Sequence, residues 1–204
     1  MLEAINLKGA RGDRCLFHSL NFQLNVGDCL MVQGENGSGK TSLLRTLVGF
    51  TPPADGAVHW NGRQIKQLDD EYRRMLLYCG HHLGLKEGLS ATENLVFGST
   101  LADAPVNSDD VYDALHQVGL QGKEQQPLRT LSQGQRRRVN LARLLLQKRA
   151  LWVLDEPLTA LDAKASQWVI EAIDRHLDKG GMVVLTTHQD LALAHPMQLI
   201  RVGT

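Results

Sequence analysis

The chain has 204 residues, a length that suits one α/β domain or at most two small ones. Lysine plus arginine and aspartate plus glutamate both number 22, so the net charge of zero gives no general attraction to nucleic acid or to an anionic membrane surface. The longest stretch without charged residues, 15–27, is too short and too polar to cross a bilayer, which takes about 20 mostly apolar residues.

The cysteines and the first residues point to a reducing compartment. Three widely spaced cysteines form no CxxC pair, which argues against a disulfide scaffold or a zinc site. The N-terminal residues lack the apolar core of a signal peptide. We therefore expect a cytoplasmic protein.

Four short apolar runs, bounded by turn-forming residues, predict strands that are buried on both faces, as in a parallel sheet. Between them, apolar residues recur with helical spacing. The expected fold is a single continuous α/β domain with helices on both faces of the sheet, and the polar segment 102–108 is the expected hinge or subdomain border. The predicted strands are 29–33, 75–78, 151–154 and 182–186, and the predicted helical stretches are 43–48, 111–118 and 139–146.

A phosphate-binding loop is predicted directly after the strand 29–33. Its sequence, GENGSGKT, meets the GxxxxGK[ST] pattern with a strand before it and an apolar-periodic helix after it. The glycines let successive N–H groups point inward and the helix N-terminus adds its positive end, so the loop suits di- and triphosphate oxygens. Lys40 is assigned to the β/γ-phosphates and Thr41 to Mg²⁺. The predicted nucleotide-binding residues of this region are Gly34, Glu35, Asn36, Gly37, Ser38, Gly39, Lys40, Thr41 and Ser42.

Two adjacent carboxylates, Asp155 and Glu156, follow the predicted strand 151–154. Open α/β sheets bind ligands at this edge. Because adjacent residues on a strand point in opposite directions, Asp155 is expected to face the magnesium shell, and Glu156 a water in line with the γ-phosphate. The pair therefore has two predicted roles, metal ligand and activator of the attacking water.

Further motifs lie between and after these two sites. LSQGQ at 131–135 precedes a predicted helix, TALD at 159–162 follows the acidic pair, and His188 follows the strand 182–186. In this order they resemble the LSGGQ signature, the D-loop and the switch histidine of the ATP-binding cassette ATPases, and the resemblance covers nearly the whole chain. Ser132 also has the simpler role of an N-cap residue for the helix.

The resemblance implies a P-loop core with an antiparallel β subdomain and a small helical subdomain inserted at about 82–148. It also implies a head-to-tail homodimer that holds two ATP, each between the loop of one subunit and the signature of the other. The implied signature contacts to ATP are Ser132, Gly134 and Gln135, the implied catalytic residues are Lys40, Glu156 and His188, and the implied ligands are ATP and Mg²⁺.

Two positions depart from the family pattern. Counted back from Glu93, the place of the family's Q-loop glutamine is taken by His81. A neutral imidazole of His81 or His82 would be able to position water, and His81 is the third predicted metal-site residue, beside Thr41 and Asp155. No aromatic residue that would stack on adenine is evident at 10–13, where Arg11 either stacks on the base or is simply solvated.

Within the family, the short chain and the segment 78–86 resemble the ATPases of bacterial cytochrome c maturation. This resemblance implies a peripheral subunit at the cytoplasmic face of the inner membrane, bound to integral-membrane permease subunits. Its ATP hydrolysis would serve haem export or the release of a haem-loaded chaperone. The alternatives are the ATPase subunit of another ABC transporter and a soluble ABC ATPase outside transport.

Contact with haem or with nucleic acid is not expected. Adjacent His81 and His82 cannot readily bind one haem iron from the same side. The three arginines of the signature helix are interpreted as solvated or packed against the partner subunit, rather than as a nucleic-acid site. They are Arg136, Arg137 and Arg138.

Overall fold

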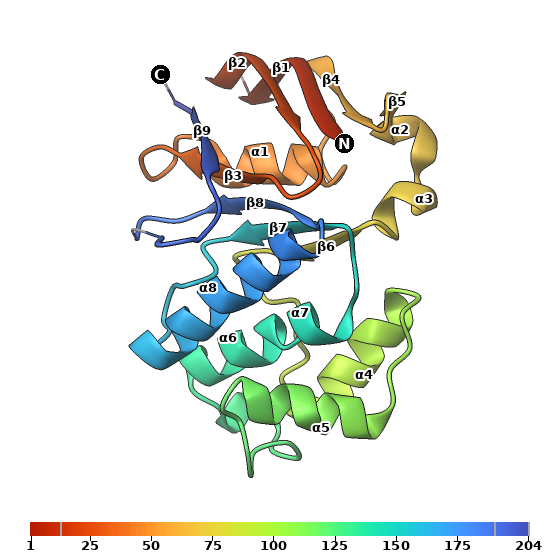
Figure 1. Cartoon of the computed structure of the whole chain (residues 1–204), viewed down its shortest axis with the longest axis vertical. Helices are drawn as coiled ribbons and strands as arrows, with labels where there is room; N and C mark the ends of the chain where they lie inside the picture. Colours follow the sequence, from red (N-terminus) through yellow and green to blue (C-terminus); the bar gives the residue numbers. More distant parts are fainter. Residues whose placement is uncertain (13, 190, 204) are drawn as a thin grey trace. The chain divides into compact units, whose positions relative to one another are not determined.

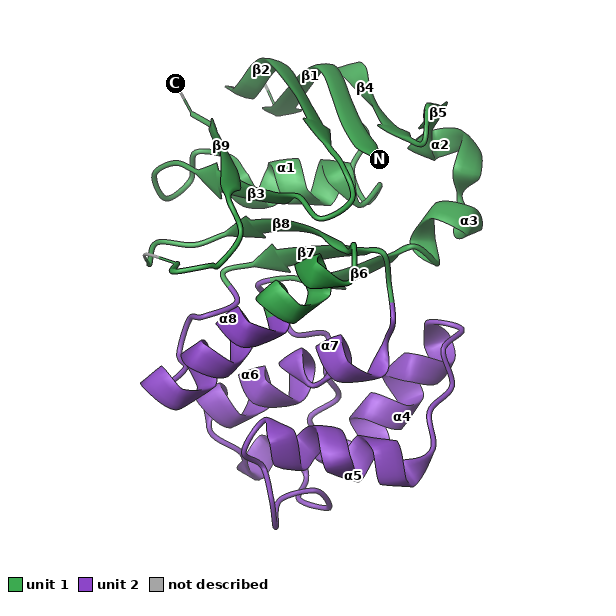
Figure 2. Ribbon diagram, viewed as in Figure 1, with its two compact units in different colours: residues 1–80, 149–156, 173–204 green, residues 81–148, 157–172 purple. Residues whose placement is uncertain are grey.

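A computed structural model describes residues 1–12, 14–189 and 191–203, so that Asp13, beside the predicted adenine contact, lies outside the described residues. The chain forms two compact units (Figure 2). The segment 102–108 lies inside the second unit, so the expected border there is wrong; compact units separate where few contacts cross, and the chain first changes units after Gly80. Unit 1 consists of residues 1–80, 149–156 and 173–204, and unit 2 of residues 81–148 and 157–172.

Unit 1 contains a five-stranded sheet in the order β6-β7-β8-β3-β9, in which every neighbouring pair is parallel. This confirms the predicted parallel sheet. The fifth strand, β9, was not predicted, because it lies at the sheet edge and its residues are partly or fully exposed, so it has no continuous apolar run. The strands are β3 Cys29–Gln33, β6 Leu76–Cys79, β7 Leu151–Asp155, β8 Met182–Thr186 and β9 Met197–Arg201.

Helices cover both faces of this sheet, as expected (Figure 1). On one face, Val153 of β7 belongs to the apolar cluster that also contains Leu43 of helix α1 (Lys40–Leu47). On the other face, the neighbouring Trp152 stacks on His176 of helix α8 (Ala163–Asp178). The alternation of side chains along a strand therefore divides β7 between the two helices.

The antiparallel β subdomain implied by the family resemblance is also part of unit 1. Its four strands are paired in the order β2-β1-β4-β5. Leu7 and Val58 of this sheet are buried in the same apolar cluster as Leu43 and Leu47 of α1, so the helix packs between apolar side chains of both sheets. The elements are β1 Leu2–Arg11, β2 Arg14–Leu24, β4 Asp55–Trp60, β5 Arg63–Gln64, α2 Ile65–Leu68 and α3 Asp70–Arg73.

Unit 2 is helical and has its own apolar core, in which Leu95, Leu115 and Val139 are buried. The predicted helix at 139–146 is interrupted: Ala142 ends one helix, and the N–H of Leu145 bonds to the carbonyl of Ala142 in a tighter turn. No helix in the described ranges is long and apolar enough to span a bilayer. The elements are α4 Ala91–Leu101, α5 Ser108–Gln117, the 3₁₀ turn η1 Leu128–Thr130, α6 Gln133–Leu141 and α7 Arg143–Leu146.

The stack of Trp152 on His176 makes the stability of unit 1 depend on pH. The ring centroids are 3.8 Å apart and the planes are parallel, and burial lowers the pKa of His176 from 6.5 to about 4. Protonation therefore opposes folding, and the free energy of unfolding should fall as the pH drops from about 6.5 towards 4.

The variant His176→Phe should lose this contribution, because phenylalanine keeps a ring in the stack but does not titrate. Urea unfolding at pH 7 and pH 5 measures the free energy of unfolding of both proteins. The decrease in the free energy of unfolding from pH 7 to pH 5 should be smaller in the variant than in the wild type. The exposed control His18→Phe should show the same decrease as the wild type. If the free energy of unfolding of His176→Phe fell as much as that of the wild type between pH 7 and pH 5, the role of His176 would be contradicted.

Candidate active site

The predicted phosphate loop connects β3 to α1 at the carboxyl end of the parallel strands. The last glycine, Gly39, is the N-cap of α1 and has a φ of 110°. A Cβ atom at this position would lie 2.8 Å from the Cβ of Leu16, so the loop passes β2 at a distance that only glycine permits. The turn therefore aims the N-terminus of α1 at the end of the sheet, where an anion can accept hydrogen bonds from backbone N–H groups.

Lys40, the first residue of α1, lies at the centre of this loop. Its side chain is buried, and the ammonium group donates hydrogen bonds to the carbonyl oxygens of Gly34, at 2.8 Å, and Glu35, at 3.2 Å. Nζ also lies 3.2 Å from Nε2 of His188, a residue that follows the neighbouring strand β8. The positive charge of Lys40 is thus fixed between the loop and the predicted switch histidine.

Asp155 is the second anchor of the site. The carboxylate is almost completely buried, with 1% of the residue exposed, and hydrogen bonds meet both of its oxygens. Oδ2 accepts from the hydroxyl of Thr41 at 2.8 Å, and Oδ1 accepts from the hydroxyl of Thr186 at 2.8 Å. Three elements, α1, β7 and β8, are therefore joined at one carboxylate.

Glu156 lies just beyond the end of β7, in the left-handed region with a φ of 52°. This conformation is unfavourable for a residue with a side chain, and the N–H of Glu156 is held in place by donating to the hydroxyl of Thr186 at 2.9 Å. Oε1 of Glu156 lies 3.3 Å from Nε2 of His188. Glu156 thus leaves the strand by a left-handed turn, and its carboxylate has a different partner from those of Asp155.

The sequence did not identify Thr186 as a site residue, although it named the segment that contains it. This threonine contacts both carboxylate residues, and its side chain is completely buried. A polar residue that ends a buried apolar strand at the ligand edge of the sheet was the available signal. The supporting role of Leu16 left no signal, because a strand distant in sequence brings it to the loop.

Tyr78 of β6 adds a half-buried phenol to this part of the sheet. Burial, followed by the negative charge of Asp155, raises the pKa of Tyr78 to about 12. The ring of Tyr78 meets Phe50 edge-on, with centroids 5.5 Å apart. The phenol is therefore neutral at physiological pH and adds no second negative charge beside Asp155.

The donor atoms of Thr41 and Asp155 fit a magnesium ion. A hydroxyl and a carboxylate oxygen lie 2.8 Å apart, and Mg²⁺ prefers oxygen ligands and is usually bound by one or two protein groups together with phosphate oxygens. Within the described part of the chain, no group of three or more His, Cys, Asp or Glu residues forms a complete metal site. These two residues would therefore bind the metal together with a phosphate ligand.

The signature segment belongs to unit 2, where Ser132 is the N-cap of α6. The Ser132 hydroxyl accepts from the N–H of Gln135, and the Gln135 side chain accepts from the N–H of Ser132, which forms a capping box. A Cβ at Gly134 would lie 2.6 Å from the carbonyl oxygen of Ala160, so the signature helix and the predicted D-loop are in direct contact. The N-cap role is therefore real, and Gly134 has a steric role that the sequence did not reveal.

Two arginines of the signature helix form ion pairs within unit 2, so they are not simply solvated, and their packing against a partner subunit stays a prediction. Arg136 donates to the carbonyl of Leu131 and pairs with Glu87 at 2.9 Å. Arg138 pairs with Asp162 of the predicted D-loop. These ion pairs join segments far apart in the sequence, and a run of basic residues gives no indication of such partners.

His81 and Arg11 are exposed, and their roles stay predictions. His81 is the first residue of unit 2, and its ring meets that of His82 edge-on, with centroids 5.6 Å apart. Arg11 is the last residue of β1. The contacts of the described residues test neither the proposed metal contact of His81 nor the proposed adenine contact of Arg11.

Sequence comparison places this geometry among known proteins. The family model described as ABC transporter matches residues 17–159. The cytochrome c biogenesis ATP-binding export protein CcmA of Pseudomonas aeruginosa is 53% identical over 203 residues, a match that covers 100% of both chains.

Two solved structures have the same fold. The putative ABC transporter ATP-binding protein of Pyrococcus furiosus matches with a TM-score of 0.84 and 26% identity, over 98% of this chain and 96% of the other. A dimeric ATP-binding cassette in a post-hydrolysis state with ADP and phosphate matches with a TM-score of 0.82 and 21% identity, over 93% of this chain and 88% of the other.

The variant Thr186→Val should destabilise unit 1 by about 2 kcal/mol or more, because valine has nearly the same shape but leaves Asp155 and the N–H of Glu156 without this hydroxyl. Urea unfolding at pH 7 measures the change. Thr186→Ser, which keeps the hydroxyl, should retain most of the stability. Thr100→Val, at an exposed position on α4, is the matched control and should change little. Equal effects of valine at the two sites would contradict the bridging role.

Proposed function

Because the chain belongs to the ABC transporter family, and matches its cytochrome c biogenesis members over the full length, we propose that it is the ATP-binding and ATP-hydrolysing subunit of a transporter complex for the biogenesis of c-type cytochromes. The observation that carries the ATPase function is the convergence of Lys40, Asp155, Glu156 and His188 at one edge of the sheet of unit 1. The full-length identity to the curated relatives carries the pathway.

ATP is held through its phosphates. The ammonium of Lys40 balances the charge of the β- and γ-phosphates, and the N-terminus of α1 provides backbone donors. Thr41 and Asp155 would hold Mg²⁺ through their hydroxyl and carboxylate oxygens, and the role proposed for His81 is that of the family's glutamine. When bound, Mg²⁺ neutralises negative charge on the phosphate oxygens.

Hydrolysis is an in-line attack of water on the γ-phosphate. Glu156 orients or deprotonates this water, and its left-handed backbone directs the carboxylate toward His188. His188 contacts the γ-phosphate or holds Glu156 in position. Thr186 is a positioning residue, because its hydroxyl fixes both carboxylate residues and touches no reacting atom.

The working unit is a head-to-tail homodimer with two ATP. Each chain has one phosphate loop and one signature segment, and each ATP is bound by the loop of one copy and by Ser132, Gly134 and Gln135 of the other. The hydroxyl of Ser132 keeps its O–H donor although its oxygen caps α6, so it remains able to donate to a phosphate. ATP binding closes the dimer and hydrolysis reopens it.

The dimer is a peripheral subunit at the cytoplasmic face of the bacterial inner membrane, bound to integral-membrane permease subunits. The ATP cycle drives haem export or the release of a haem-loaded chaperone. The cassette performs the same work in either case, because it supplies only the closing and opening motion. We assign no haem contact and no nucleic-acid contact to this chain.

Lys40→Ala should weaken nucleotide binding at least about tenfold, because a charge-assisted hydrogen bond to phosphate is lost. Calorimetric titration with ATP in the presence of Mg²⁺ measures the dissociation constant. Lys148→Ala, at an exposed lysine outside the loop, is the control and should bind as the wild type does. An unchanged dissociation constant in a folded Lys40→Ala protein would refute the phosphate role.

Glu156→Gln should lower the steady-state ATPase rate at least about 100-fold while ATP still binds, since the amide cannot accept the proton of the attacking water. With ATP the variant should accumulate as a dimer in gel filtration. Glu171→Gln, on the exposed side of α8, serves as the matched control. Near wild-type turnover of Glu156→Gln would remove Glu156 from the mechanism.

The same variant tests the pathway. Tagged Glu156→Gln protein with ATP is recovered from native membranes in mild detergent, and the bound proteins are identified by mass spectrometry. Integral-membrane subunits together with cytochrome-assembly proteins are expected. An unrelated permease would retain the ATPase and reject the cytochrome pathway, while only soluble partners would reject the transport function.

A further inference from the structure

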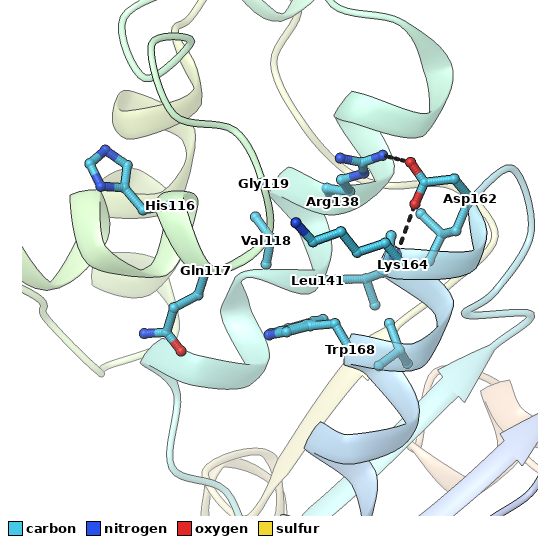
Figure 3. Close-up of a pocket in the computed structure, with 12 residues that line it drawn as sticks. His116, Gln117, Val118, Gly119, Arg138, Leu141, Asp162, Lys164 and Trp168 are labelled. Atoms are coloured by element: carbon cyan, nitrogen blue, oxygen red, sulfur yellow. Dashed lines mark hydrogen bonds and ion pairs between the residues drawn. The ribbon is translucent and has the colours of Figure 1, made fainter.

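Unit 2 contains a pocket of about 240 Å³ that no step of ATP binding or hydrolysis uses (Figure 3). It lies between the end of α5, the second half of α6 and the first turns of α8. No residue of the phosphate loop and no residue of the LSQGQ segment lines it. A ligand in this pocket would therefore be bound in addition to ATP.

The floor of the pocket is apolar. Val118 and Leu141 are buried in it, and Trp168 of α8 is half-buried and presents its indole ring. Lys164 lies one helical turn before Trp168, and both side chains extend in the same direction, toward Val118 (Figure 3). A flat aromatic ring placed on this floor would cover apolar surface and meet the ammonium group at the same time.

The charged groups around the pocket have a surplus of positive charge. Arg138 and Lys164 are cationic, and Asp162 is the single lining carboxylate. The N–H of Ala165, with the added charge of Arg138, holds the pKa of Asp162 below its usual range, so this residue stays ionised. His116 at the rim is engaged with Glu124 at 2.7 Å. The lining thus carries two cations against one anion.

The two cations of the lining differ in their partners. The guanidinium of Arg138 pairs with Asp162, whereas the ammonium group of Lys164 extends over the apolar floor (Figure 3). The acceptor that suits these two cations is a carboxylate.

Size and lining together select the class of ligand. The volume is below the range of about 300–1,000 Å³ that is typical of drug-sized ligands, which argues against a nucleotide. An inorganic anion alone would leave the apolar floor uncovered. We propose that this pocket binds a small aromatic carboxylate of one or two rings, with the ring on Trp168 and the carboxylate between Lys164 and Arg138.

The tryptophans provide a direct readout with full-length protein. Trp60 and Trp152 are buried and belong to unit 1, whereas Trp168 is the tryptophan of this pocket. In a ¹H–¹⁵N NMR titration with unlabelled indole-3-acetate, the indole N–H signal of Trp168 should shift with saturation, while the signals of the other two stay in place. Trp168→Phe assigns the signal.

The charge is tested separately from the apolar contact. Neutral indole-3-acetamide has the same ring and should bind at least about threefold more weakly than the carboxylate. Lys164→Gln should weaken binding of indole-3-acetate by about the same factor, because Lys164 is exposed and its ion pairs are partly screened. The control Lys148→Gln, outside the pocket, should bind as the wild type does.

Three results would overturn the proposal. The first is the absence of a saturable Trp168 shift up to about 10 mM ligand. The second is equal affinity for the carboxylate and the amide, which would mean that the cations are not used. The third is an unchanged affinity in Lys164→Gln. ATP binding, measured in the same samples, is expected to persist in every variant, so these outcomes are independent of the proposed ATPase function.

Discussion

The buried carboxylate of Asp155 is the group on which the site depends. A charge with 1% exposure is tolerated only when hydrogen bonds compensate its lost hydration, and here the hydroxyls of Thr41 and Thr186 do so. These bonds hold the start of α1 and the end of β8 against the end of β7. Because Thr186 also accepts from the N–H of Glu156, the same network fixes the strained turn that directs the second carboxylate toward His188.

Unit 2 has a corresponding junction around the start of α6. Because Gly134 has no side chain, the helix can contact the carbonyl of Ala160 directly. Arg138 of the same helix pairs with Asp162, which lies two residues after Ala160. The signature segment and the predicted D-loop are therefore joined by a steric contact and an ion pair. The pocket of unit 2 that is proposed to bind an aromatic carboxylate adjoins this junction, since Arg138 and Asp162 also line the pocket. Contacts that keep the signature in place are thus near the proposed second ligand.

Identity and geometry answer different questions about this protein. The full-length similarity to cytochrome c biogenesis proteins points to the pathway, whereas distances in unit 1 explain how an ATPase operates. The likeness to the dimeric cassette shows the fold, and the proposed pairing of two copies rests on one loop and one signature per chain.

The sequence alone determined the parallel core and the phosphate loop, because apolar runs and the GENGSGKT pattern are local signals. The antiparallel sheet was foreseen only through family resemblance. Tertiary structure decided the rest: the exposed edge strand β9, the break at Ala142, the bridging of Asp155 and Glu156 by Thr186, and the packing of Ala160 on Gly134. These features depend on contacts between residues distant in the chain, and no local pattern of residue types encodes which distant partner a side chain will meet.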